Sequence, residues 1–246
     1  MLEVHVHSSQ EAGIFANAYI VETDRSLISI DATLTVDEAR GFRDRLANLR
    51  KPLKAVLITH AHPDHVAGIT EWLPSADTPI YAVRKVEQLM KATEEQKRAQ
   101  WGPVFKDQWI ARWIYPNQIV KHGESVNVDD HVFRVADTGA GGDCDANSVW
   151  ILKGNPERAF VGDLIFNGTH SYLADGHIQA WLNNLRYIRS LLTDNTLCIR
   201  ATGSPATWRS SNCKKDICGS TAGRLRPLLA ANLLSMNRKQ KNWCGA

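Results

Sequence analysis

The chain has 246 residues, of which 43% are hydrophobic and 22% charged, and its formal net charge is +3. These values are those of an ordinary soluble globular protein, and the length suits one large domain with a substantial core. No apolar run reaches the roughly 18–20 residues that a membrane helix needs, and the N-terminus does not resemble a signal peptide. The five cysteines form no CxxC pair, which argues against a disulfide framework or a zinc knuckle. We therefore expect a cytoplasmic protein without a membrane partner.

The first part of the chain alternates predicted strands and helices. Residues 18–22 and 27–31 are rich in β-branched side chains and flank a turn-like segment, which predicts two short strands. Residues 36–49 place apolar side chains at helical spacing among charges and predict an amphipathic helix. Residues 55–58 form a continuous apolar strand that ends directly before a group of histidines. Functional residues commonly lie where a strand passes into a loop in layered α/β proteins.

The rest of the chain continues this alternation. Helices are predicted at residues 83–101 and 180–192, and strands at residues 132–136, 148–152 and 159–161. The chain contains no internal repeat and no low-complexity linker. We therefore expect one α/β domain.

Four potential metal ligands lie within six residues after the strand at 55–58. They are His60, His62, Asp64 and His65. If the backbone stays extended into the loop, the i, i+2 spacing directs His60 and His62 to the same side. Asp64 and His65 can then turn toward a second position beside the first. Imidazole nitrogens and carboxylate oxygens are good ligands for zinc and similar ions, so the set favours a metal site over four unrelated polar residues.

The HxHxDH pattern formed by these residues resembles the signature of the metallo-β-lactamase superfamily, whose members share an αβ/βα sandwich. Two further segments match in the expected order. Residues 160–166 resemble the strand-Gly-Asp segment of the family, and Asp31 matches a common acidic position below the site. The resemblance covers about residues 15–197. It implies an α/β protein in which residues 1–197 form a four-layer αβ/βα metallo-β-lactamase-like sandwich.

The resemblance also implies a ligand set for two divalent ions, with zinc as the expected metal. His60 and His62 would hold the first ion, Asp64 and His65 the second, and Asp163 would bridge the two. A metal-bound water loses a proton near neutral pH and attacks a substrate whose oxygen the metals polarise. Asp64 is also placed to orient that water, and Asp163 would bridge the two ions. The expected catalytic residues are therefore Asp64 and Asp163.

One expected ligand is replaced, and one further histidine is a candidate for substrate contact. The family usually has a third histidine before the bridging aspartate, but residues 137–148 contain none. Asp143 is the first candidate to replace it, Asp145 the second and the thiol of Cys144 the third. An oxygen ligand would also admit manganese or calcium. His170, after the bridging aspartate, is expected either to contact substrate or supply a ligand, or to cap nearby backbone.

A group of aromatic residues lies in a stretch where such enzymes often build a substrate wall. The group consists of Trp101, Trp109, Trp113 and Tyr115. Packing of a hydrophobic cluster between helices is the favoured alternative for these side chains.

Residues 198–246 differ in composition from the rest of the chain. They contain nine Lys or Arg and one acid, Asp216, for a charge of about +8, whereas the preceding part has 20 basic and 25 acidic residues, or −5. Four of the five cysteines and none of the nine histidines lie there. The late Pro-Gly-His-Gly-like turn that closes the site in the family is also missing. A basic tail can bind nucleic acid or anionic lipid, although a plain surface tail is at least as well supported.

A shifted reading frame offers a third interpretation of this tail. With most third bases free, the shifted codons from Ile199 onward permit Tyr-Pro-Gly-His-Gly, and those for residues 208–221 permit an amphipathic helix. We therefore interpret residues 198–246 as an atypical basic tail derived from a frameshift, which needs no nucleic-acid partner. The coding DNA around Leu197 tests this interpretation, because codons that do not spell the turn in the shifted frame would end it.

These observations predict a metal-dependent hydrolase with a small-molecule substrate. A small ester or lactone is expected first, because the HxHxDH pattern resembles that of the acyl-homoserine lactonases, which share this fold. Quorum-quenching opening of an N-acyl-homoserine lactone is the specific expectation, with activity weakened by the two missing histidines. Phosphodiester or thioester hydrolysis on the same fold is the alternative, as is a degenerate sandwich that binds metal without catalysis. The sequence does not predict an oligomeric state.

Overall fold

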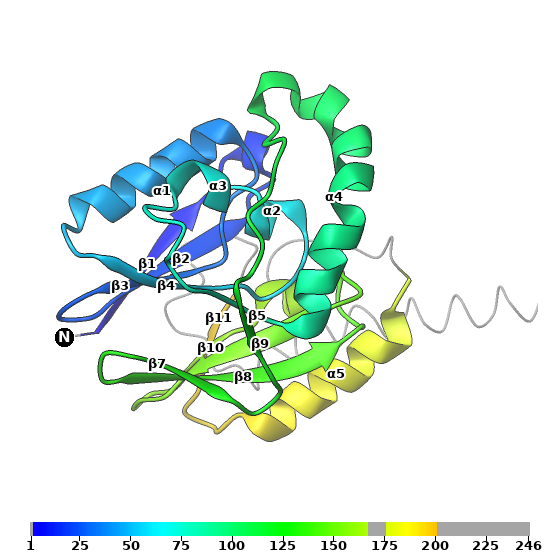
Figure 1. The fold of residues 1–246 in the computed structure, drawn as a ribbon. Helices are drawn as coiled ribbons and strands as arrows, with labels where there is room; N and C mark the ends of the chain where they lie inside the picture. The colour runs from blue at the N-terminus through cyan, green and yellow to red at the C-terminus, as the bar shows by residue number, and fades with distance from the viewer. Residues whose placement is uncertain (1, 167–175, 201–246) are drawn as a thin grey trace, which may run out of the picture.

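The computed structural model of the chain describes residues 2–166 and 176–200. Two β-sheets pack face to face, and helices cover the outer side of each sheet (Figure 1). The layers follow as helix, sheet, sheet and helix, which confirms the predicted α/β sandwich. His170 and residues 201–246 of the predicted tail lie outside the described residues.

Each sheet is built from one continuous half of the chain. The six-stranded sheet has the order β1-β2-β3-β4-β5-β6, with strands Glu3–Ser8 (β1), Asn17–Glu22 (β2), Leu27–Ile30 (β3), Leu53–Leu57 (β4), Ile80–Val83 (β5) and Gln118–Val120 (β6). The first three strands pair antiparallel, and β3 to β6 pair parallel. The parallel strands end together at one edge, which is where the histidine segment begins.

The second sheet is formed by the later strands. Its order is β11-β10-β9-β8-β7, with strands Ser125–Val128 (β7), His131–Gly139 (β8), Asn147–Leu152 (β9), Arg158–Phe160 (β10) and Leu197–Ile199 (β11). All pairs are antiparallel except β10 with β11. Because β11 contains Cys198 and Ile199, the first residues of the predicted tail are part of this sheet.

Helices fill the outer layers and the connections. They are Val36–Asn48 (α1), Pro63–Val66 (α2), Ile69–Trp72 (α3), Arg84–Phe105 (α4) and Ile178–Leu191 (α5), with short 3-10 turns at Glu11–Gly13, Lys106–Gln108 and Gly162–Leu164. Figure 1 shows α1 and α3 outside the first sheet and α5 outside the second. None of the helices in the described part of the chain is long and apolar enough to cross a membrane.

The strand β9 shows how alternating side chains hold the layers together. All six of its residues are buried. Trp150 belongs to the core between the two sheets, whereas Val149 and Ile151 pack with Trp181 of α5 on the opposite side. Successive side chains of a strand point to opposite faces, so one short strand contributes to two apolar layers. Burying each large apolar side chain stabilises the fold by roughly 1.5–3 kcal/mol.

The predicted elements are all present, with differences at their ends. α4 begins at Arg84 rather than at Val83, because Val83 is the last residue of β5, and it continues to Phe105. The residues after His62 form the single helical turn α2 rather than a loop, with Pro63 at the first helical position, which proline favours. The strands β1, β5, β6, β7 and β11 were not predicted. Four of these five have only three or four residues, too few for a periodic pattern.

Candidate metal centre

The candidate ligands follow strands of both sheets. β3 and β4 are parallel, so Asp31 and His60 leave the sheet on the same side. In the second sheet, β10 leads through Gly162 to Asp163. An isolated bridge between His60 and Asn147 joins the two sheets at this edge. The edge therefore collects side chains that are far apart in the sequence.

Gly162 allows the bridging aspartate segment to approach the histidine segment. Its φ is +54°, in the left-handed region that favours glycine. A Cβ atom there would lie 2.7 Å from Thr59 Oγ1 and 3.2 Å from His60 Nδ1. Since a real Cβ does not tolerate the shorter contact, the glycine is a steric requirement of the site.

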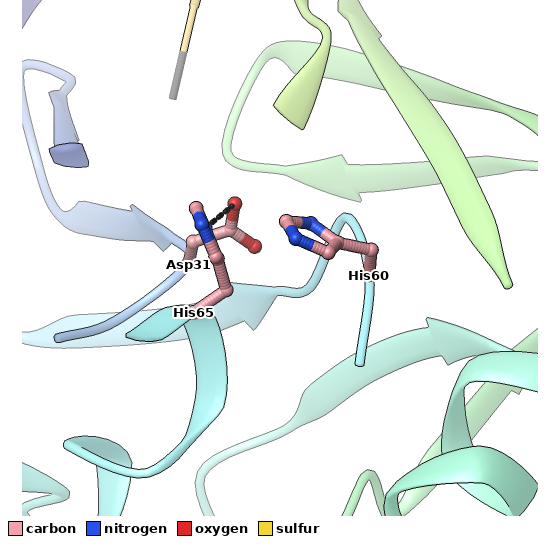
Figure 2. Close-up of side chains that lie close together, drawn as sticks. All are labelled: Asp31, His60 and His65. Atoms are coloured by element: carbon pink, nitrogen blue, oxygen red, sulfur yellow. Dashed lines mark hydrogen bonds and ion pairs between the residues drawn. The ribbon is translucent and has the colours of Figure 1, made fainter. Parts of the chain in front are cut away.

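Asp31 lies below the ligands and orients two of the neighbouring segments. It is 2% exposed, and its φ of +59° is one that aspartate tolerates better than most residues. Its carboxylate accepts hydrogen bonds from the Thr59 backbone N–H at 2.7 Å and the Thr59 hydroxyl at 2.6 Å. It also accepts one from His65 Nδ1 at 3.0 Å, as Figure 2 shows. This contact fixes the His65 ring and leaves Nε2 for the centre, as in many metal sites.

The first group of candidate ligands consists of His60, His62 and Asp143, whose ligand atoms lie within 4.8 Å of one another. Asp143 Oδ2 is 3.0 Å from His62 Nδ1 and 3.9 Å from His60 Nε2. Among the described residues, His60 Nε2 and Asp143 Oδ1 are buried without a hydrogen-bond partner. Burial, with the charges of His65 and His62, holds the pKa of His60 well below its usual range. The neutral His60 ring therefore offers a lone pair on Nε2, and the buried Asp143 Oδ1 has no hydrogen-bond donor. A bound cation would satisfy both atoms.

The second group consists of Asp64, His65 and Asp163 and meets the same 4.8 Å limit. His65 Nε2 lies 3.1 Å from Asp64 Oδ2 and 3.8 Å from Asp163 Oδ2. Burial acts to lower the pKa of His65, but the carboxylates of Asp64, Asp31 and Asp163 outweigh it and raise that pKa well above normal. Burial likewise acts to raise the pKa of Asp64, yet His65 lowers it to about 2. A divalent ion would take over the charge compensation that a protonated His65 supplies, so this group also fits a metal.

The structure brings one of the three candidate replacements for the third histidine close to the other candidate ligands. Asp143 lies with His60 and His62, as described above. Asp145 is exposed, and its carboxylate lies 2.6 Å from His177 Nε2. Cys144 is buried, and burial raises the pKa of its thiol, which keeps it protonated. No candidate ligand group among residues 2–166 and 176–200 includes Asp145 or Cys144.

The chain after β11 begins where the late turn of the family was expected. The Arg200 carbonyl accepts hydrogen bonds from the Tyr19 hydroxyl and from Asn17 Nδ2, the latter at 3.4 Å. The sequence contains no histidine after His177. The second group therefore gains no late histidine ligand from this chain. His170, the predicted substrate contact, lies outside the described residues.

A cavity of about 210 Å³ opens over the two groups, and His62, Asp64, Asp143 and Asp163 contribute to its lining. Its apolar walls are formed by Ile14, Leu34, Trp101, Phe105 and Phe166. Sequence reasoning considered only Trp101 of these five. Trp109 and Trp113 are instead buried in the core, which confirms the packing alternative for those two. The four-residue spacing of Trp101 and Phe105 on one helix was the available signal for this wall.

The sequence and structural comparisons agree with this architecture. The sequence profile of the metallo-beta-lactamase superfamily matches residues 12–198. The chain therefore belongs to the metallo-β-lactamase superfamily of metallo-hydrolases. Among solved structures, a metallo-beta-lactamase from Pontibacter korlensis is similar with a TM-score of 0.69 and 16% identity, covering 92% of this chain and 99% of that chain. This likeness supports the fold.

Curated relatives of the chain have different activities. A hydroxyacylglutathione hydrolase of Prochlorococcus marinus strain MIT 9301 is 24% identical over 71% of this chain and 59% of that protein. A ribonuclease J of Sinorhizobium meliloti is 25% identical over 73% of this chain and 30% of that protein. The chain thus spans about a third to three fifths of the length of these two relatives, and they do not share one substrate.

Proposed function

We propose that the protein is a metal-dependent hydrolase of a small ester or lactone. The observation that carries the proposal is the pair of ligand groups beside one apolar cavity. The proposed metal ligands are His60, His62, Asp64, His65, Asp143 and Asp163. Zinc is the expected ion, and the carboxylate of Asp143 also makes manganese or calcium chemically acceptable.

The chain's own residues have distinct proposed roles in the reaction. A bound divalent ion supplies a nucleophilic water near neutral pH and polarises the carbonyl of the substrate. Asp64 lines the cavity and would orient that water. Asp163 belongs to the second ligand group and, as the family resemblance implies, would be shared with the first. Asp31 keeps His65 in a fixed orientation. Trp101 and the other apolar side chains exclude bulk water and hold the apolar part of the substrate.

The cavity favours a small molecule over a polynucleotide. Its volume of about 210 Å³ suits a compact ligand, and its walls are mainly apolar. A groove for nucleic acid would present several Lys or Arg side chains, whereas among residues 2–166 and 176–200 the lining includes one, Lys97. The proposed function thus needs no nucleic-acid or membrane partner. An N-acyl-homoserine lactone is the first specific candidate, because it joins a lactone ring to an apolar acyl chain.

Thioester hydrolysis is the second candidate, since hydroxyacylglutathione hydrolases are among the relatives. Phosphodiester hydrolysis is the third, since the relatives also include ribonuclease J. Both use the same ligand groups. A panel of one lactone, one thioester and one phosphodiester therefore tests the reaction class separately from metal binding.

The double substitution His60→Ala/His62→Ala tests the metal centre. It removes two of the three side chains of the first group, so tight binding of a divalent ion should be lost and hydrolysis should fall to background. Metal content by elemental analysis and rates on the substrate panel measure both effects. The matched control is His122→Ala/His131→Ala, which removes two histidines outside the ligand groups. Unchanged metal stoichiometry in the first variant would rule out the assignment.

A further inference from the structure

Lys97 lies on the side of α4 that borders the metal centre. Thr93, Lys97, Trp101 and Phe105 are each four residues apart and so share one side of the helix. Trp101 and Phe105 line the cavity over the ligands, and Thr93 lines a neighbouring cavity of about 270 Å³. Lys97 and His62 line both cavities. The lysine is therefore placed at the border between the two spaces, beside a candidate ligand.

The charged group of Lys97 differs from the other cations of this helix. Lys91 pairs with Glu87 at 2.5 Å, and Arg98 pairs with Glu95 at 2.6 Å. Lys97 is half-buried, yet it forms no ion pair within the described residues. No ion pair of the described residues occupies the Lys97 ammonium, so it is available to an anionic ligand in the cavities that this residue lines.

The charge balance of the metal-loaded centre leaves Lys97 available for an anion. Four carboxylates belong to the centre, those of Asp31, Asp64, Asp143 and Asp163. When added metal fills both ligand groups, two divalent ions would offset all four. Lys97 then adds a positive charge that the four carboxylates of the centre no longer offset, next to walls that are mainly apolar. Asp145, which lines the neighbouring cavity, pairs with His177.

We propose that Lys97 binds an anionic group of the substrate, a carboxylate carried on the same molecule as the scissile ester. Trp101 and Phe105 would pack against the apolar link between the two groups. This inference rests on the proposed hydrolase function, and it places small esters or lactones with a free carboxylate ahead of the neutral N-acyl-homoserine lactone as substrates. A neutral N-acyl-homoserine lactone lacks this group, so the two substrates are distinguished by their dependence on Lys97.

Two esters of matched size test this role in the zinc-loaded full chain. The anionic one is the mono-para-nitrophenyl ester of glutaric acid, and the neutral one is its methyl diester analogue. Lys97→Met should raise KM for the anionic ester about tenfold, the scale of one charge-assisted hydrogen bond, with little change in kcat. KM for the neutral ester should stay unchanged. Lys97→Arg should retain most of the preference, because it keeps the charge.

The control for net charge is Lys54→Met, which removes an exposed lysine in β4 outside the lining of both cavities. A binding measurement avoids catalysis altogether. Phenylbutane sulfonate carries an anion that is a poor zinc ligand, and calorimetry should show about tenfold weaker binding to Lys97→Met than to the wild type or Lys54→Met.

Each outcome bears on one proposal. Equal changes in KM for the two esters, or sulfonate binding that does not depend on Lys97, would overturn the role of Lys97. If neutral esters are hydrolysed at the same time, the proposed hydrolase function stands. Sulfonate binding that depends on Lys97, with no ester hydrolysed, would support the anion site and contradict the ester hydrolase.

Discussion

At the scale of single residues, the candidate metal centre depends on side chains and a glycine that are not candidate ligands. Asp31 accepts hydrogen bonds from Thr59 and His65 and so connects the ends of β3 and β4 with α2. Gly162 lets the chain after β10 lie against Thr59 and His60. The orientation of the candidate ligands therefore depends on neighbouring residues that would not contact the metal themselves.

Substitution of Gly162 by alanine should lower the free energy of unfolding more than a positive φ alone explains. The new Cβ would lie 2.7 Å from Thr59 Oγ1, and such overpacking costs about 1–3 kcal/mol in addition to the cost of the backbone conformation. Gly123→Ala is the matched control, because Gly123 has a φ of +82° and a Cβ added there would meet no atom within 4 Å. The control should lose only roughly 1–2 kcal/mol. Equal losses for the two variants in urea unfolding would show that the close approach is unimportant.

At the scale of elements, local sequence and tertiary contacts both determine where the helices lie. α1 begins after Thr35, whose hydroxyl accepts a hydrogen bond from the Glu38 backbone N–H at 3.4 Å. Its buried side is formed by Ala39, Phe42 and Leu46, at the spacing expected of an amphipathic helix. In α4, by contrast, the spacing of Lys97 and Trp101 predicts only that the two side chains share one side of the helix. The tertiary structure shows that this side lines the cavity over the candidate ligands.

Loss of the α1 cap should measurably destabilise the first sheet and its covering helix. Thr35→Ala removes the acceptor for the Glu38 N–H and should lower the free energy of unfolding by about 1 kcal/mol. Thr35→Ser keeps a hydroxyl in the same place and should lose much less. Urea midpoints of the wild type and both variants give the comparison. A serine variant as unstable as the alanine variant would assign the effect to packing of the threonine methyl group.

At the scale of the whole molecule, the two sheets meet at the edge where both ligand groups form. The first group replaces an expected histidine with Asp143, and the second lacks the late histidine of the family. The first departure changes the type of ligand, while the second removes one from the set. We therefore expect a lower metal affinity than a centre with the complete ligand set of the family would have. The stabilisation of the fold by bound metal should be smaller for the same reason.

The protein as isolated should hold fewer than two tightly bound zinc ions. Losing a direct ligand should cost more than the roughly 10–100-fold loss of affinity that follows removal of a supporting partner. Since ions bind the folded state, added zinc or manganese should raise both the melting temperature and the hydrolysis rate. His60→Ala/His62→Ala should show a smaller rise in melting temperature. Two zinc ions per chain after extensive dialysis would contradict this expectation.

The sequence by itself determined an α/β domain and the first ligand segment, and the family resemblance of that segment implied the sandwich fold. His60, His62, Asp64 and His65 follow a strand within six residues, so local spacing was enough to predict that they share a site. The long, periodic strands and helices were predictable for the same reason. Four short strands, β5, β6, β7 and β11, were not predicted, because a strand of three or four residues is stabilised mainly by pairing with distant segments.

Only the tertiary structure separated Asp143 from its neighbours and placed Lys97 at the site. Three consecutive residues at 143–145 all carry possible ligand atoms, and spacing cannot rank them in an irregular loop. The fold directs Asp143 toward His62, pairs Asp145 with His177 and buries Cys144. These outcomes depend on contacts between segments far apart in the chain, and no local pattern encodes such contacts.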